Sequence, residues 1–467
     1  MDPHSIDPAR HYPIQKSDDY IRGRCYESAQ KIYTPAVHPR EPFATSRGMR
    51  VSPFYEREVT LRGYFMEVAG WERAHGYAAN EETLLAKYRD QVPVREAEWD
   101  SRHFWEVSNA EQLAMSEGVG MINLSHFAIF DVEGADAEGL MEYLSVAKVG
   151  ADTAIGKGVY THFLDHAGGI RSDLTIIRLA EDCFRVVCGG DTGHRDYIWM
   201  RDMSDRKGFS NVTFHDRSEE LATLGLWGPE ARVTLAKLID DPESISTKSF
   251  PFATTKEITV CGVKVWAFRI SYVGEQGWEL YFPFSDGLAV WDALFKLGVT
   301  PVGIETYANS RRLEKSLRLQ NADLEIDYNL YEAGLARPKV KAADFHGKEA
   351  YVQQRELDEQ AAYLCTFVLQ DTTDSNGVVR YPVGNWPILD PASKEVIIDA
   401  HGRRSYTTSM AFGPSLGVNV AMGYLPTDKA KECDTVLIEY FGDHYEAKVM
   451  KVGYGALLDP TNERPKS

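Results

Sequence analysis

Two glutamates flank a short turn in residues 271–284, SYVGEQGWELYFPF. Gly274 and Gly277 bracket Glu275, so the backbone can turn sharply there and approach a ligand closely. Glu279 follows in an apolar, aromatic run that is typical of a buried strand. A buried carboxylate needs a hydrogen-bond donor, and a heterocycle such as a pterin offers two parallel N–H donors, from its cyclic amide and its amino group. The alternative is a hairpin turn whose acids face solvent.

Residues 159–179, VYTHFLDHAGGIRSDLTIIRL, repeat this arrangement of strand, turn and carboxylate. Tyr160 comes before a Gly168-Gly169 turn, and Asp173 opens the next apolar strand. A carboxylate that faces a site from the end of a turn suits acid–base chemistry on an amine nitrogen. The alternative is an ordinary hairpin with Asp173 on its solvent side.

A tyrosine and several cations follow in residues 301–319, PVGIETYANSRRLEKSLRL. Tyr307 lies where a loop ends and a helix begins. The helix carries Arg311, Arg312 and Lys315, which include groups that could bind a carboxylate. The alternative for these cations is the solvated face of a helix.

The histidine and cysteine positions indicate no metal site. His126 lies in NLSHFAIF, residues 123–130, among alternating strand residues, and a single histidine in a strand serves structure more often than catalysis. The six cysteines are far apart and form no C-x-x-C pair, so neither a disulfide framework nor a zinc site is expected. This cysteine usage fits a reducing cytosol.

The chain is acidic, with 51 Lys plus Arg against 69 Asp plus Glu and a net charge of −18. No window forms a basic run, whereas a phosphate backbone attracts positive charge, so nucleic acid is not an expected partner. The first residues lack the basic and apolar regions of a signal peptide, and nowhere do about 18 uncharged apolar residues run together. We therefore expect a soluble cytoplasmic protein that does not contact a membrane.

The predicted elements divide the 467 residues into three segments. Residues 1–50 have frequent prolines and charges but poor periodicity, which predicts an extended N-terminal arm. Residues 51–355 alternate β-rich runs with amphipathic helices, which indicates an α+β region rather than regular βαβ units. Within it, Ser108 and Glu111 have the spacing of a capping box at the start of a helix. Residues 356–467 return to strand and turn, which predicts a small β-domain.

An ordered series of motifs runs from about residue 50 to the C-terminus. The motifs are GWERAHGY (70–77), GGIRSDLT, RISYVGEQGWEL, RRLEKS, LYEAGL (330–335), DFHGKEAY (344–351) and DPTNER (459–464). Together they resemble the aminomethyltransferase superfamily of tetrahydrofolate enzymes, which includes the glycine-cleavage T-protein, and especially the folate half of dimethylglycine and sarcosine dehydrogenases. The resemblance implies an α+β, three-lobed cloverleaf fold with a central folate channel and a C-terminal β-barrel-like domain that closes one side.

The resemblance also implies roles for single residues. Glu279 would hold the pterin ring, with Glu275 supporting the same turn. Tyr160 would line the folate pocket, and Trp278 belongs to the same cofactor-binding set. The dehydrogenases carry an N-terminal flavin domain, and this sequence has neither room nor a G-x-G-x-x-G fingerprint for one, so no flavin is expected in this chain.

Two departures from the T-protein pattern bear on the chemistry. Ser172-Asp173 stands where the T-protein has Asp-Asp, which leaves open which of the two addresses N5 of the folate. In lignin-type aryl methyl ether demethylases, a similar family, a tyrosine four residues after the glycine of PVG carries the essential acid, and PVGIETY puts Tyr307 there. This stretch also has one residue more than the T-protein between PVG and RRLE.

The favoured hypothesis is a tetrahydrofolate-dependent O-demethylase that moves a methyl group from a small methoxylated aromatic acid to N5 of tetrahydrofolate. Tyr307 would act as general acid, Asp173 would face the folate nitrogen, and His126 would lie near the leaving oxygen. The hypothesis includes tetrahydrofolate as co-substrate, no metal, and no obligatory protein partner.

Three alternatives stay open from the sequence. The first is aminomethyl or methylene transfer, either as a T-protein or as the folate subunit of a dimethylglycine- or sarcosine-type oxidase whose flavoprotein is a separate chain. The second is a demethylase that acts on a sulfonium sulphur. The third is a folate-binding maintenance protein like the iron–sulphur repair relatives, although their signature KGCYxGQE is absent.

Overall fold

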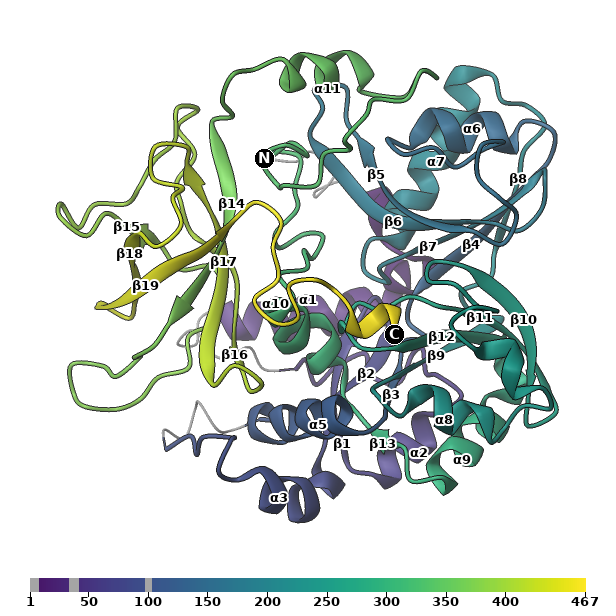
Figure 1. The fold of residues 1–467 in the computed structure, drawn as a ribbon, viewed down its shortest axis with the longest axis horizontal. Coiled ribbons are helices and arrows are strands. Elements are labelled where there is room, and N and C mark those ends of the chain that lie inside the picture. The colour runs from purple at the N-terminus through teal and green to yellow at the C-terminus, as the bar shows by residue number, and fades with distance from the viewer. Residues whose placement is uncertain (1–7, 33–41, 97–102) are drawn as a thin grey trace.

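The computed structural model describes residues 8–32, 42–96 and 103–467. Figure 1 shows three lobes around a central region that holds helix α10 (Arg311–Glu314), and each lobe is built on one sheet. This arrangement confirms the predicted α+β fold with three lobes. Within the described ranges, no helix combines the length and the apolar composition that crossing a bilayer requires.

The first lobe is a six-stranded sheet in the order β10-β11-β12-β9-β3-β13. Its strands are β3 (Gly120–Asn123), β9 (Leu221–Trp227), β10 (Thr255–Val260), β11 (Val263–Phe268), β12 (Gly277–Pro283) and β13 (Thr300–Pro301). Helices α2 (Tyr55–Thr60), α8 (Ala231–Ala236) and α9 (Gly287–Lys296) belong to this lobe (Figure 1). Alternate residues of β12, Trp278, Leu280 and Phe282, enter the apolar core with Trp291 of α9, because successive side chains of a strand point to opposite faces.

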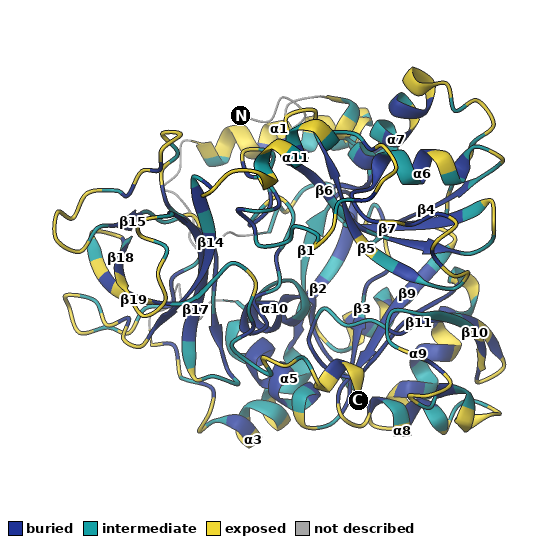
Figure 2. Cartoon of the chain, turned by 45° about the horizontal axis from the view of Figure 1, so that its top comes forward, coloured by how far each residue is buried: buried dark blue, intermediate teal, exposed yellow. Residues whose placement is uncertain are grey.

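The second lobe is a five-stranded antiparallel sheet in the order β5-β6-β7-β4-β8. Its strands are β4 (Ala128–Glu133), β5 (Gly158–Leu164), β6 (Ile170–Arg178), β7 (Cys183–Cys188) and β8 (Thr213–Asp216). Helices α6 (Ala137–Leu144) and α7 (Gly193–Lys207) bury apolar side chains against it, among them Leu140 and Met200. Figure 2 shows the strands buried and the outer faces of these helices exposed.

The third lobe is the C-terminal sheet, in the order β15-β18-β19-β14-β17-β16. Its strands are β14 (Ala362–Leu369), β15 (Ile388–Leu389), β16 (Thr407–Gly413), β17 (Val418–Pro426), β18 (Thr435–Tyr440) and β19 (Asp443–Val452). The sheet curls around its own apolar core, as expected for the predicted barrel-like domain. Helix α11 (Lys348–Arg355) precedes it in the chain.

The central region joins the lobes. The antiparallel ribbon of β1 (Gly63–Val68) and β2 (Trp71–Tyr77) lies behind α10 in Figure 2. Helix α5 (Trp105–Glu117) packs against β2 and against a π-helical turn over Glu81–Leu85, which is followed by the short helix α3 (Ala86–Tyr88). A second π-helical turn, Thr306–Ser310, runs directly into α10.

The N-terminal segment differs from the extended arm predicted for residues 1–50, because it contains the 15-residue helix α1 (Asp18–Ile32). Acidic residues in its first turn and Lys31 in its last turn complement the helix dipole. Arg24 pairs with Glu67 of β1 at 2.5 Å, and Glu27 accepts hydrogen bonds from the backbone at residues 44–45. These contacts hold the helix on the body of the protein.

The predicted capping box was wrong, since α5 begins at Trp105, before Ser108. The Ser108 hydroxyl instead donates to the His75 carbonyl at 2.9 Å. The Glu111 carboxylate accepts from the backbone N–H groups of Tyr77 and Gly303, both at 2.8 Å. The two side chains therefore fix α5 to its neighbours rather than cap it.

Candidate active site

Glu279 lies at the middle of β12, between β9 and β11, on the face opposite the apolar core. Its carboxylate accepts a hydrogen bond from the hydroxyl of Tyr281, two residues along the same face. Only 6% of Glu279 is exposed, and burial raises its pKa to about 7. No cation pairs with it in the described part of the chain. A carboxylate offers about four acceptor positions, so Glu279 keeps capacity for N–H donors of a ligand.

Tyr307 stands in a cluster of aromatic rings. The rings around it, with their centroid distances, are Tyr272 (4.9 Å), Trp227 (5.7 Å) and Phe127 (6.1 Å). Burial raises the pKa of Tyr307 well above its ordinary value, and the charges of Glu279 and Asp173 act in the same direction. The hydroxyl is therefore protonated, and no described residue forms a hydrogen bond with it.

The loop before Tyr307 is held tightly against β2. A Cβ atom on Gly303 would lie 2.0 Å from the carbonyl oxygen of His75, so only glycine fits at this distance. His75 Nδ1 in turn lies 3.3 Å from a carboxylate oxygen of Glu305. The π-helical turn then begins at Thr306, and such turns occur frequently at functional sites.

Asp173 and Tyr160 form a pair at the edge of the second lobe. The Tyr160 hydroxyl donates to Oδ2 of Asp173 at 3.0 Å. Burial raises the pKa of Asp173 to about 6, and the nearby carboxylates of Asp196 and Asp191 add to the rise. The neighbouring Ser172 turns the other way: it is fully buried, and its hydroxyl donates to Asp196. Of the two residues, Asp173 is the accessible one.

His126 lies in the turn between β3 and β4, not within a strand as the sequence suggested. Its ring packs edge to face on Phe127 at a centroid distance of 5.4 Å, and Phe127 also contacts Tyr307. Burial, followed by the nearby Arg73 and His75, lowers the pKa of His126 well below its ordinary value. The imidazole is therefore neutral at physiological pH.

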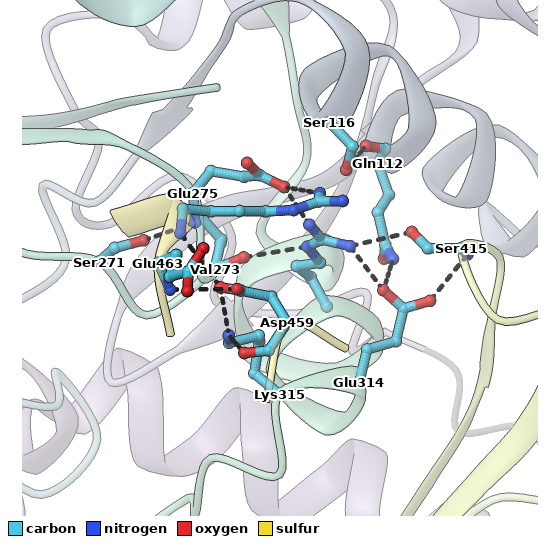
Figure 3. Close-up of polar contacts among 12 residues, drawn as sticks. Gln112, Ser116, Ser271, Val273, Glu275, Glu314, Lys315, Ser415, Asp459 and Glu463 are labelled. Carbon is cyan, nitrogen blue, oxygen red and sulfur yellow. Dashed lines mark hydrogen bonds and ion pairs between the residues drawn. The ribbon is translucent and has the colours of Figure 1, made fainter. Parts of the chain in front are cut away.

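The cations of the predicted helix are neither solvated nor free. Arg311 is fully buried and pairs with Glu275 and, at 2.8 Å, with Glu314. Lys315 pairs with Asp459 at 3.1 Å. Figure 3 shows these carboxylates converging from different parts of the chain. The third cation, Arg312, pairs with buried Asp323, so all three cations already have carboxylate partners within the protein.

The predicted site residues separate into two groups. Tyr307, Glu279 and Asp173 lie close enough for each carboxylate to affect the pKa of the tyrosine, and Tyr160 joins them through Asp173. Glu275 supports its turn, as an acceptor of Arg311 and of Arg464 at 2.9 Å. Trp278 is fully buried in the core face of β12, where it packs on Phe250, so the structure does not bring it to the other predicted residues.

Several site side chains are only partly buried although burial shifts their pKa. They are Asp173, His126, Tyr272 and Tyr307, together with Tyr160, of which 39% is exposed. Beside Tyr160 the surface forms a cavity of about 450 Å³, whose wall includes His162 and Arg337.

Sequence reasoning missed Tyr272, Tyr281 and Arg73. Tyr281 was detectable, because strand alternation places it on the same face as Glu279. Arg73 belongs to the motif GWERAHGY, but nothing in the sequence around it predicts a role in the site. Tyr272 contacts Tyr307 from 35 positions away in the chain, at a ring distance of 4.9 Å, and no local pattern indicates that contact.

Comparisons with known proteins identify the family. Residues 54–341 match the family model described as the GCVT N-terminal domain, which covers more than half of the chain. The chain belongs to the glycine cleavage T-protein (GCVT) family. Residues 387–452 of this GCVT-family chain match the glycine cleavage T-protein C-terminal barrel domain. Residues 1–52 match the FAD dependent oxidoreductase central domain, so the expectation that the chain holds no flavin stays a prediction.

Similar proteins fall into two groups. The chain is 29% identical to mitochondrial dimethylglycine dehydrogenase from Homo sapiens over 466 residues, covering 98% of this chain and 50% of that protein. It is 30% identical to an aminomethyltransferase from Herpetosiphon aurantiacus over 397 residues, 84% of this chain and 95% of that protein. The GCVT-family chain thus spans about half the length of the dehydrogenase relatives that it matches.

A solved structure shows the same fold. The aminomethyltransferase T of the glycine cleavage system from Bartonella henselae matches with a TM-score of 0.68 and 22% identity, over 86% of this chain and 97% of that one.

The site of the GCVT-family chain fits a reduced folate: Glu279 has acceptor positions for a pterin N–H edge, and Asp173 offers an accessible carboxylate for an amine nitrogen.

Proposed function

We propose that the chain is a tetrahydrofolate-dependent O-demethylase that transfers the methyl group of a small methoxylated aromatic acid to N5 of tetrahydrofolate and releases a phenol. The observation that carries this proposal is the Tyr307 hydroxyl, which is protonated, has no hydrogen bond to a described residue and stands among aromatic rings. An aromatic substrate packs favourably on such rings. A proton donor beside it is what the leaving oxygen of a methyl ether needs.

In this reaction, the bond between the methyl carbon and the ether oxygen breaks as a bond between that carbon and N5 forms. Tetrahydrofolate supplies the nucleophilic N5 when it is bound. Tyr307 donates its proton to the leaving oxygen, which would otherwise depart as a phenolate. The carboxylate of Asp173, ionised above its pKa of about 6, accepts the proton that N5 loses. Exchange with solvent restores both groups, so the products are the phenol and 5-methyltetrahydrofolate.

Other residues bind and orient the reactants in this proposal. Glu279 accepts the N–H donors of the pterin, with Tyr281 holding the carboxylate in place. The cavity beside Tyr160 receives the rest of the folate, and Arg337 on its wall is a cation for a carboxylate there. The neutral imidazole of His126 lies on the Phe127 side of Tyr307, near the leaving oxygen. The chain acts without an obligatory protein partner.

The test is anaerobic incubation of the protein with tetrahydrofolate and a panel of methoxylated benzoates, with the phenol and 5-methyltetrahydrofolate measured by mass spectrometry. Both products are expected in equal amounts. Tyr307→Phe should lower kcat by about 100- to 10,000-fold, the usual contribution of a general acid. Tyr26→Phe is the matched control, since Tyr26 is 67% exposed on α1 and should leave the rate unchanged. Equal rates for Tyr307→Phe and the wild type would reject the mechanism.

Methylene transfer is the second candidate, because residues 1–52 match a domain of FAD dependent oxidoreductases. In that case the chain would accept an activated one-carbon unit made by a flavoprotein. Folate binding without methyl transfer from any methoxyl donor, combined with 5,10-methylenetetrahydrofolate formation when a sarcosine- or dimethylglycine-oxidising flavoprotein is added, would replace the O-demethylase proposal with this one.

A further inference from the structure

One cation of the central region has no carboxylate partner. Arg73 is on β2, and within the described residues it forms neither an ion pair nor a hydrogen bond. Its Nε atom is fully buried without a partner, while part of the side chain stays accessible. A buried charge is costly unless it is paired. An arginine in this condition is therefore expected to have its partner in a bound ligand.

Strand geometry places Arg73 on the face of β2 that fronts the Tyr307 segment. Arg73 and His75 are two residues apart on one strand, so their side chains share a face. His75 Nδ1 lies 3.3 Å from Glu305, which is two residues before Tyr307. The positive charge of Arg73 also lies near enough to His126 to act on its imidazole.

The acids around Arg73 already have other partners. Glu67 pairs with Arg24 at 2.5 Å, and Asp191 accepts from Asn321 at 3.3 Å. Glu305 accepts from the side-chain amide of Asn309 at 2.7 Å. Burial lowers the pKa of Arg73, and each of these three acids lies near enough to oppose that shift, although none bonds to the guanidinium. The two terminal nitrogens of the guanidinium thus keep their four N–H donors for a ligand.

We infer that Arg73 binds the carboxylate of the substrate and so selects aromatic acids over neutral aromatic ethers. This inference rests on the proposed function, whose substrate class it specifies. The planar guanidinium matches a carboxylate in a two-point contact. With the acid group held at β2, the ring lies toward the aromatic cluster of Tyr307, and the methoxyl group faces the Tyr307 hydroxyl.

The experiment compares binding of 3-methoxybenzoate and its neutral analogue 3-methoxybenzamide by isothermal titration calorimetry. The wild type should prefer the benzoate. Arg73→Met should lose that preference, with affinity for the benzoate lowered about 10- to 100-fold, as for loss of a charge-assisted hydrogen bond, and affinity for the benzamide unchanged. Arg73→Lys should restore part of the preference. Arg22→Met, at an arginine whose side chain is 82% exposed, should behave as the wild type.

Two results would overturn the inference: an unchanged preference in Arg73→Met, or a wild type that does not distinguish the two compounds. A structural role is separated by thermal unfolding without ligand. Arg73→Met should have a Tm equal to or above that of the wild type, because an unpaired buried charge is removed, and a clear fall in Tm contradicts the inference.

Binding and turnover keep the two proposals apart. If the wild type binds the benzoate through Arg73 but makes no 5-methyltetrahydrofolate, the carboxylate site stands and the demethylase function fails. If methyl transfer occurs and Arg73→Met leaves KM for the acid unchanged, the function stands and the assignment of Arg73 fails. A KM raised about 10- to 100-fold at a similar kcat is the expected result.

Discussion

Glu279 and Asp173 have pKa values of about 7 and about 6, in both cases because burial disfavours the charged form. Neither carboxylate has a cation partner in the described part of the chain. The buried cations Arg311 and Arg312, in contrast, are paired with other carboxylates, Glu275 and Asp323. The structural carboxylates are therefore paired with cations, whereas Glu279 and Asp173 keep acceptor positions for a ligand. Shifted groups of this kind concentrate at functional sites.

The raised pKa of Glu279 predicts a pH dependence of stability. The ordinary pKa is 4.5 and the folded value about 7, so between these pH values the folded state binds the proton more tightly than the unfolded state. The free energy of unfolding should therefore fall as pH rises, by up to about 3 kcal/mol from this group. Glu279→Gln should lack this loss. The free energy of unfolding of the variant, relative to the wild type, should therefore be higher at pH 7.5 than at pH 4.5.

Urea unfolding of both proteins at the two pH values measures the difference in their free energies of unfolding. The contributions of the other titrating groups cancel in this difference. Glu257→Gln is the control, because the Glu257 side chain is 48% exposed on β10 of the same sheet. A wild type and Glu279→Gln with parallel pH profiles would show that the Glu279 carboxylate is not desolvated.

Sequence alone was sufficient for Glu279, because two local signals, strand alternation and apolar neighbours, fix its burial. It was not sufficient for the cations. Arg311 looks like a solvated helix residue until Glu275, 36 positions earlier, is brought against it. The same limit applies to Arg73, because the sequence does not reveal that this arginine has no carboxylate partner in the folded protein.

At the scale of elements, β2 and the segment before the π-helical turn are in direct backbone contact. Gly303 is the contact point, 2.0 Å from the His75 carbonyl for an added Cβ, and its N–H donates to Glu111 of α5. The loop, the strand and the helix therefore position Tyr307 together.

Gly303→Ala should separate these elements and displace Tyr307. Because backbone atoms rather than a flexible side chain oppose the new methyl group, we expect methyl transfer to fall by at least about 100-fold, as for other small misplacements of a reacting group. Steady-state kinetics measures this loss. Gly402→Ala is the comparison: its site is open, and only its φ of +79° opposes the substitution, so stability should fall by about 1 kcal/mol at unchanged kcat. Wild-type kcat in Gly303→Ala would refute the role of this contact.

The start of α5 shows why element boundaries were harder to predict than element types. The Ser108–Glu111 spacing is a good local capping signal, yet both side chains bond to other elements and the helix begins earlier. Tertiary contacts overrode the local preference. The helix α1 is a second example, since its contacts with Glu67 and residues 44–45 are distant in sequence.

At the scale of the whole molecule, buried polar contacts of Arg311 join the first lobe, α10 and the C-terminal lobe. Arg311 connects the turn before β12 to α10 through Glu275 and Glu314, and its Nη1 donates to Ser415 of the C-terminal lobe at 2.9 Å. Figure 3 shows Ser415 and Asp459 approaching this cluster from the C-terminal part of the chain. The three lobes were predictable because an ordered series of motifs runs through them. The contacts of Arg311 between lobes were not predictable, because each of them joins segments that are distant in the sequence.

Two arginines that bond to the same oxygen of Glu275 allow a matched test. Arg311 is fully buried, and the Arg464 side chain is 46% exposed. Arg311→Met leaves Glu314 buried without a cation and Glu275 with Arg464 alone, and it should lower the free energy of unfolding by about 3–5 kcal/mol. Arg464→Met should cost at most about 1 kcal/mol. Chemical denaturation measures both, and equal losses would contradict the assigned difference in burial.

The π-helical turn Thr306–Ser310 lies where the resemblance to the T-protein pattern predicts one extra residue between PVG and RRLE. A π-turn closes over i→i+5 and so contains one residue more than an α-turn. One extra residue therefore fits inside the helix without a loop, and α10 continues from Arg311 without a break. Tyr307 therefore lies in the π-helical turn, whereas Arg311, which pairs with Glu275, begins the α-helix that follows. This helix can consequently present a different side chain to a substrate without disturbing the ion pairs of Arg311.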